Sequence, residues 1–214
     1  SHVYKYKCQS FAQYSNIFSN RNLKRTVLSI PYPVPKTEKE CKKIMSKNFL
    51  TLVIQARMNS TRFPNKVISD LSGAPLIVRI LQRVKKVKKI GKIIIATTKK
   101  REDDILVGIA KSNRVEIFRG SENDLVDRYY QAVKGKNVGH ILRLPADNPI
   151  PDPSEYNRLI NYHLKTDNGF SSNICNFMGN GYPDGIGVEI FTIKSLKRIW
   201  KNEKRKKFRE HLAL

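Results

Sequence analysis

Strands and helices alternate in the pattern of apolar and polar positions from Phe49 to the end of the chain. Near-continuous apolar runs are typical of strands that are covered on both faces. They predict strands at residues 49–56, 92–98, 115–118, 139–147 and 187–192. Apolar positions at helical spacing predict helices at residues 74–90, 101–113, 122–133, 152–164 and 193–214. This alternation predicts an α/β fold, with three layers and a doubly wound, mostly parallel sheet.

Residues 1–48 have a different pattern, with aromatic residues but no clean period. Pro31, Pro33 and Pro35 stand at alternate positions, which favours an extended, non-helical segment. We predict that residues 1–48 form a basic appendage or linker of unknown role, and that residues 49–214 form one α/β domain.

The charge of the chain is unusual, because 41 Lys and Arg stand against 18 Asp and Glu, a formal net charge of +23 at pH 7. Such an excess favours polyanionic partners: nucleic acid, an anionic membrane surface or phosphorylated small molecules. A Lys-rich background composition that covers every solvated face is the alternative.

Cysteine usage and hydropathy indicate the compartment. Cys8, Cys41 and Cys175 lie far apart without a C-x-x-C pair, which argues against a disulfide framework and a zinc site. No apolar run approaches the ~18 residues of a membrane span, and the N-terminus lacks the apolar core of a signal peptide. We therefore predict a cytoplasmic protein without a membrane span.

The segment RMNSTRFPNK follows the first predicted strand, at the sheet edge where α/β proteins bind ligands. Arg57, Arg62 and Lys66 bring three positive charges to this loop, and Ser60 and Thr61 add hydroxyl donors. Guanidinium and ammonium groups suit phosphate oxygens, so the loop can hold a triphosphate without a P-loop, whose motif is absent. A solvated basic loop is the alternative.

Two further segments carry acidic candidates. Asp147, after the fourth predicted strand, suits a hard divalent cation, although a helix or turn cap is the other reading. Asp184 and Glu189 lie in YPDGIGVE and can bond sugar hydroxyls or a metal, or form a turn before a strand. Arg119 and Arg128 are weaker ligand candidates, because each can instead pair with an acidic neighbour, namely Glu122, Asp124 or Asp127.

In this order the segments resemble the cytidylyltransferases that make CMP-activated acid sugars, and most closely the spore-coat-polysaccharide type. The resemblance covers roughly Leu50 to the end, in QARMNSTRFPNKVISDLSGAPLIVRILQRV, IIIATT, EDD, IFRGSENDLVDRYYQA, RLPADNPIPDP, YPDGIGVEIF and REHL. It implies a fold of the nucleotide-diphospho-sugar transferase type, Mg²⁺ as the cofactor and pyrophosphate as the by-product.

The resemblance also implies roles by position. Arg57, Ser60, Thr61, Arg62 and Lys66 match the triphosphate loop; Gln55, Ala56, Thr97 and Arg119 would lie near the cytosine and ribose. Asp147 matches the metal-binding acid, and Asp184 and Glu189 would face the sugar. Arg128, a candidate from its residue type and position alone, is also predicted to bind the substrate. Arg57, Arg62, Lys66 and Asp147 are the predicted catalytic residues.

The chain departs from the family pattern at two places. Asn59 and Asn65 stand where the family commonly has Gly; because Asn tolerates left-handed backbone, we expect the turn to be kept. Family members continue past Glu-His-Leu into a further strand and helix. This chain stops at Leu214, so we expect it to lack them.

The function expected is transfer of CMP from CTP to an acid sugar or related sugar. CTP and the sugar are the expected partners, and assembly as a homodimer is left open. The alternative is a catalytically inactive, basic nucleotide- or nucleic-acid-binding module, which the charge keeps open although no nucleic-acid motif is found. A glycosyltransferase is a third reading, but ADNP does not supply its D-x-D-like metal motif.

Overall fold

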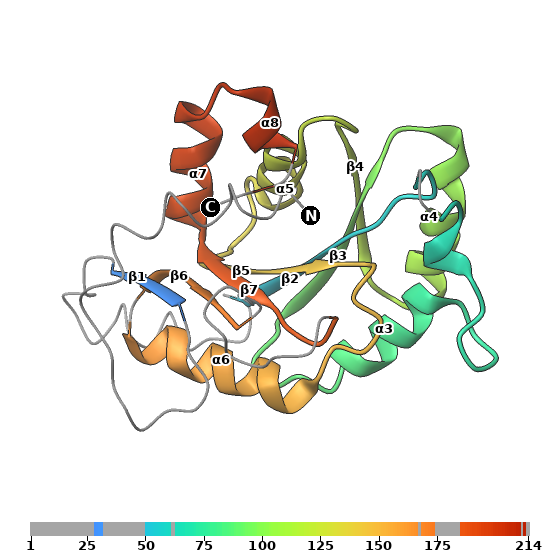
Figure 1. Cartoon of the computed structure of the whole chain (residues 1–214), viewed down its shortest axis with the longest axis horizontal. Coiled ribbons are helices and arrows are strands. Elements are labelled where there is room, and N and C mark those ends of the chain that lie inside the picture. The colour runs from blue at the N-terminus through green and yellow to red at the C-terminus, as the bar shows by residue number, and fades with distance from the viewer. Residues whose placement is uncertain are drawn as a thin grey trace.

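A seven-stranded mixed sheet forms the centre of the protein (Figure 1). The computed structural model describes residues 28–31, 50–60, 63–166, 168–173, 185–210 and 212. The sheet order is β1-β6-β7-β5-β2-β3-β4. The strands are β1 (Leu28–Pro31), β2 (Leu50–Gln55), β3 (Lys92–Thr98), β4 (Glu116–Gly120), β5 (His140–Pro145), β6 (Asn168–Ser172) and β7 (Glu189–Thr192).

The sheet has a parallel half and an antiparallel half. β2 pairs in parallel with both β3 and β5, and β3 pairs in parallel with β4. β7 pairs antiparallel with β5 and β6, and β1 pairs antiparallel with β6. The predicted strands all belong to this sheet, so the predicted α/β class is confirmed.

Helices cover both faces of the sheet, and this gives the three layers. One face carries α3 (Leu76–Val84), α4 (Asp104–Ser112) and α6 (Pro153–Thr166); the other carries α5 (Leu125–Val133), α7 (Ile193–Asn202) and α8 (Lys206–Arg209). Figure 1 shows α5, α7 and α8 on the side of the sheet opposite α3 and α6. Side chains of β2 alternate between the layers: Leu52 and Ile54 pack with α3, and Val53 packs with α5.

Three helices begin at side chains that accept hydrogen bonds from free backbone N–H groups. Asp124 accepts from the Asp127 N–H at 2.8 Å at the start of α5, and Thr192 from the Ser195 N–H at 3.1 Å at the start of α7. Asp152 accepts from the Ser154 N–H at 2.7 Å, with Pro153 as the first residue of α6. The predicted start of that helix is therefore confirmed.

Two predicted helices were wrong in their extent, and one strand was missed. The first helix was predicted to reach residue 90 but ends at Val84; the residues after it form turns, and Lys89 takes a left-handed φ of 65°. The last helix was predicted as one element but breaks at Glu203, whose extended backbone separates α7 from α8. β6 was missed, because its sequence NGFSS is polar although the strand is buried.

The predicted appendage contains one described element. β1 lies within residues 1–48 and adds an edge strand beside β6. The other residues of that segment lie outside the described ranges, so the boundary at residue 48 stays a prediction. In the part of the chain that the structure describes, no helix has the length and apolar character to cross a membrane.

Two histidines form a buried pair between β5 and α6. His140 Nδ1 lies 2.9 Å from His163 Nε2, and His163 Nδ1 lies 2.8 Å from Ser171 Oγ. The exposed fractions of the two side chains are 4% and 0%. Burial lowers the pKa of His140 to about 4 and that of His163 to about 3, so both rings are neutral in the folded protein near pH 7.

We predict that this pair makes the protein less stable in mild acid. The unfolded histidines take up protons below a pKa near 6.5, whereas the folded ones do so only near 4 and below. Protonation therefore favours the unfolded state in this window, and the free energy of unfolding falls as the pH drops from about 6.5 to 4. Urea titrations at pH 7 and 4.5 should differ by roughly 3 kcal/mol. His140→Asn should show a smaller difference; an unchanged pH dependence would contradict the assignment.

Candidate functional site

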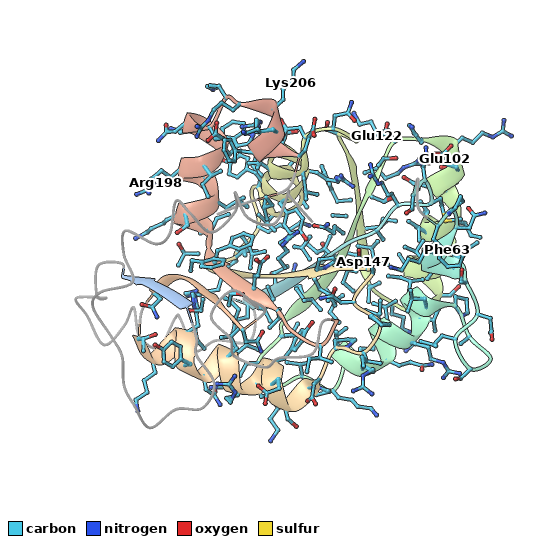
Figure 2. All side chains as sticks on the ribbon, viewed as in Figure 1. Phe63, Glu102, Glu122, Asp147, Arg198 and Lys206 are labelled. Carbon is cyan, nitrogen blue, oxygen red and sulfur yellow. The ribbon has the colours of Figure 1, made fainter. Side chains whose placement is uncertain are left out.

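The four parallel strands end at one edge of the sheet, called here the carboxyl edge. Gln55 lies in register beside Ala96 and Pro145, and Thr98 lies beside Gly120. The segments after β2, β3, β4 and β5 therefore meet at this edge. Figure 2 labels one residue from each: Phe63, Glu102, Glu122 and Asp147. This is where parallel α/β sheets bind ligands.

The segment after β2 is a loop whose two ends are joined by a backbone hydrogen bond, called here the neck. In the neck the Asn65 N–H donates to the Met58 carbonyl oxygen at 3.0 Å. Arg57 precedes Met58 and Lys66 follows Asn65, so these two cations flank the neck. Asn65 takes a φ of 60°, which confirms the predicted left-handed position, whereas Asn59 has no positive φ. Arg57 is exposed, and Ser60 and Lys66 are half-buried. Thr61 and Arg62 lie outside the described residues.

A buried carboxylate fixes this loop to the neighbouring strand. Asp103, in the short helix η4 (Arg101–Asp103) after β3, is only 1% exposed. It accepts hydrogen bonds from the Met58 N–H at 2.7 Å, from the Thr98 N–H at 3.2 Å and from the Thr98 hydroxyl. Burial by itself raises the pKa of Asp103, but these hydrogen bonds outweigh it, so the pKa lies below its usual range.

Arg119 is committed to contacts within the protein. Its Nε donates to the Thr98 carbonyl at 3.0 Å, its Nη2 to the Lys100 carbonyl at 2.8 Å, and its Nη1 pairs with Asp104 at 2.6 Å. The partner is thus a fourth acid, not one of those considered from the sequence. Ala56 and Thr97, predicted near the base and ribose, are buried beneath the edge.

Gln55 belongs to a polar network under the centre of the edge. Its Oε1 accepts from the Tyr129 hydroxyl at 3.1 Å and from Arg143 Nε at 3.3 Å. Since Arg143 only donates, this contact fixes the side-chain amide, and Gln55 Nε2 has no hydrogen-bond partner among the described residues. Arg143 also pairs with Glu189 across β5 and β7, so Glu189 is held by a cation.

The two acidic segments meet beside the end of β5. Gly185 has a φ of 88°, and a Cβ there would lie 3.0 Å from Pro149, so Gly185 packs against the turn that carries Asp147. Asp147 is exposed and makes no hydrogen bond or ion pair within the described ranges. Asp184 lies outside them. In the same part of the chain no group of three or more His, Cys, Asp or Glu gathers as a metal site.

The donor set at Asp147 suits Mg²⁺. This ion is usually held by one or two carboxylates together with water and the phosphate oxygens of a substrate. An exposed carboxylate without a partner, at the edge that carries the cationic loop, is the arrangement such binding requires.

Arg128 of α5 lies under the same edge, near the end of β4. Its side chain is 4% exposed, and its Nη2 donates to the Glu122 carbonyl at 3.3 Å. Gly120 leaves room for it, because a Cβ there would lie 3.0 Å from Arg128 Cγ. Neither Asp124 nor Asp127 pairs with it.

Sequence reasoning missed three residues that organise this site. Asp103 was predicted only as part of the helix at residues 101–113 and of the EDD segment. Arg143 carried a usable signal, because a charge between Leu142 and Leu144 in a buried strand implies a specific partner. Tyr129 had no such signal, since its hydroxyl meets Gln55 only through the fold.

Comparison with known proteins identifies the family and the fold. A family model described as cytidylyltransferase matches residues 51–214. The chain belongs to the cytidylyltransferase family. The match begins in β2 and includes every segment that forms the carboxyl edge.

Two relatives match about three quarters of this chain. An uncharacterized protein of Methanocaldococcus jannaschii is 38% identical over 161 residues, which cover 75% of this chain and 64% of the relative. The spore coat polysaccharide biosynthesis protein SpsF of Bacillus subtilis is 29% identical over 177 residues, 78% of this chain and 72% of that protein. This chain thus spans about two thirds of the length of these relatives.

Solved structures show the same architecture. A cytidylyltransferase from Leptospira borgpetersenii superposes with a TM-score of 0.72 at 32% identity, over 77% of this chain and 68% of that one. A CMP:2-keto-3-deoxy-manno-octonic acid synthetase in complex with CTP gives a TM-score of 0.56 at 16% identity, over 77% and 83%. The predicted nucleotidyltransferase-type fold is therefore confirmed.

We predict that Asp103→Asn destabilises the protein far more than Asp104→Asn does. Asp103 is buried and an amide cannot accept all its hydrogen bonds, so the loss should be about 2–4 kcal/mol. Asp104, the adjacent acid, makes an ion pair whose carboxylate side chain is 55% exposed, and its loss should cost less than about 1 kcal/mol. Urea unfolding of both variants measures the difference. Equal losses would show that the buried carboxylate has no special role.

Proposed function

We propose that this protein transfers CMP from CTP to an acid sugar or a related sugar and releases pyrophosphate, in the synthesis of a cell-surface polysaccharide. The observation that carries the proposal is the meeting of a cationic loop and an unpaired carboxylate at one sheet edge. Arg57 and Lys66 flank the loop neck after β2, and Asp147 follows the adjacent strand β5.

The loop suits the triphosphate. The cations of Arg57 and Lys66 offset the charge of phosphate oxygens, and the fixed neck keeps them in place before the ligand arrives. Asp103 supports this arrangement, because it holds the Met58 N–H next to Arg57. The binding free energy is then not spent on ordering the neck.

The chemistry is a substitution at phosphorus. A sugar hydroxyl oxygen attacks the α-phosphorus of CTP, and the bond to the pyrophosphate oxygen breaks. Mg²⁺ held by Asp147 would neutralise charge on the phosphate oxygens when bound. Arg57 and Lys66 would stabilise the negative charge that develops on the leaving pyrophosphate.

The sugar is proposed to lie over β5 and β7. Arg143 and Glu189 meet there, and Gly185 packs against the turn of Asp147. Support for an acid sugar comes from the fold shared with the 2-keto-3-deoxy-manno-octonic acid synthetase, and support for a polysaccharide comes from the name of the Bacillus relative. A cytoplasmic location and a homodimer stay predictions.

Calorimetric titration with CTP, UTP, ATP and GTP in Mg²⁺ tests the nucleotide. We expect a clear preference for CTP, and pyrophosphate release when an accepted acid sugar is added.

Lys66→Ala should weaken CTP binding about tenfold or more, because a charge-assisted phosphate contact contributes about 1.5–3 kcal/mol. Lys165→Ala, an exposed lysine on α6, is the matched control and should bind CTP like the parent chain.

Equal affinity for the four nucleotides would contradict the proposal. If that affinity also fell steeply with salt, the protein would simply attract polyanions, and the nucleic-acid alternative would be favoured.

One observation favours that alternative: α7 and α8 present exposed cations without an acidic partner among the described residues, including Arg198 and Lys206 (Figure 2).

A further inference from the structure

The carboxyl edge holds two largely buried arginines, and their surroundings differ. Arg143 pairs with Glu189, and its guanidinium also bonds Gln55. Arg128 has no acidic side chain within ion-pair distance in the described part of the chain. Burial lowers the pKa of both guanidinium groups, but for Arg143 the charge and hydrogen bond of Glu189, together with the charges of Tyr129 and Asp147, outweigh burial and raise the pKa. For Arg128 burial prevails, and the pKa lies below its usual value.

The hydrogen-bonding capacity of Arg128 is largely unused. Of its polar atoms only Nη2 has a partner, the Glu122 carbonyl at 3.3 Å. Nε is buried and has no hydrogen-bond partner among the residues that the structure describes. Nη1 bonds no described residue and is not sealed from solvent, so this end of the guanidinium opens outward. A planar cation is therefore held below the surface with donors left free.

The protein is built to keep Arg128 in this place. A Cβ at position 120 would lie 2.7 Å from Phe118 and 3.0 Å from Arg128 Cγ, so only Gly fits beside the arginine stem. A buried, unpaired charge costs free energy, and an unsatisfied donor adds to that cost. The fold thus holds a cation whose partner the described residues do not supply.

We infer that Arg128 binds an oxyanion of the substrate, and that this oxyanion is a phosphate of the nucleotide. The inference rests on the proposed function and adds to it a phosphate contact outside the loop. Arg128 packs on Gly120 at the end of β4, and it is close enough to Arg57 of the loop after β2 for the charge of Arg57 to lower its pKa. A guanidinium can bond two oxygens of one phosphate, so Arg128 and Arg57 together can hold the phosphate chain.

A sugar carboxylate is the other source of an oxyanion at this edge. Arg128 lies at β4, whereas the Arg143–Glu189 pair, over which the sugar is proposed to lie, belongs to β5 and β7, three and four strands away in the sheet order. The loop after β2 begins only two strands from β4, so phosphates held by this loop would lie nearer to Arg128 than the sugar would. Position therefore favours the phosphate.

The experiment compares the parent chain with Arg128→Met, Arg128→Lys and the control Arg198→Gln, which removes one exposed charge on α7. Affinities for pyrophosphate, CTP, cytidine and acetate are measured by calorimetry at fixed salt, and the Tm is measured without ligand. We expect Arg128→Met to bind pyrophosphate and CTP at least about tenfold more weakly, with cytidine binding unchanged. The affinity of Arg128→Lys for pyrophosphate and CTP should lie between those of the parent chain and Arg128→Met. Lysine keeps the positive charge but loses the planar guanidinium that can bond two phosphate oxygens.

The Tm separates a binding role from a structural one. Met has a similar length and no charge, so without ligand Arg128→Met should melt at or above the parent temperature. Pyrophosphate should raise the Tm of the parent chain and of Arg198→Gln, but raise that of Arg128→Met much less. Should Arg128→Met fail to fold, weakened pyrophosphate binding by folded Arg128→Lys still supports the inference, and unchanged binding overturns it.

Other outcomes overturn the inference. A lower Tm of Arg128→Met with unchanged pyrophosphate affinity would make Arg128 a structural residue. Loss of acetate binding alone would assign it to a carboxylate. If CTP is preferred and Arg128→Met binds it normally, the inference fails while the proposed function stands. If no nucleotide is preferred but pyrophosphate binding still depends on Arg128, the oxyanion site stands and the proposed function fails.

Discussion

The buried carboxylate of Asp103 is the contact on which the candidate site depends. It joins the backbone of the loop after β2, through Met58, to the end of β3, through Thr98. Without this contact the two segments would be adjacent only through strand pairing, which ends at Gln55 and Ala96. With it, the loops after β2 and β3 lie side by side in the same order as their strands. The backbone positions that carry the cations beside the neck are then fixed.

The arginines of the carboxyl edge fall into distinct groups. Arg119 and Arg143 are bound by acidic side chains and hold the edge together. Arg57 is exposed on the loop, and Arg128 is buried without a carboxylate partner among the described residues. A net charge of +23 by itself indicates only attraction for polyanions. A specific site is distinguished by two features. Some arginines are bound to acidic side chains while Arg57 and Arg128 are available to a ligand, and Asp147 is unpaired among the described residues.

The sequence predicted the parallel half of the sheet, because buried strands such as β2 and β3 are continuous apolar runs. It did not predict β6, whose buried side chains are mostly polar and bond partners in other elements, as Ser171 does with His163 of α6. The cationic loop and Asp147 were found because residue type and position after a strand are visible locally. The roles of Asp103 and Tyr129 were not, since each depends on segments that only folding brings together.

Hydrogen–deuterium exchange with and without CTP and Mg²⁺ tests most directly whether a nucleotide lies across the carboxyl edge. The account predicts slower exchange in peptides that cover Ala56–Lys66, Lys99–Asp103 and Gly120–Arg128, and no change in α7 and α8. Slower exchange confined to α7 and α8, or spread evenly over the basic surface and lost with salt, would contradict it.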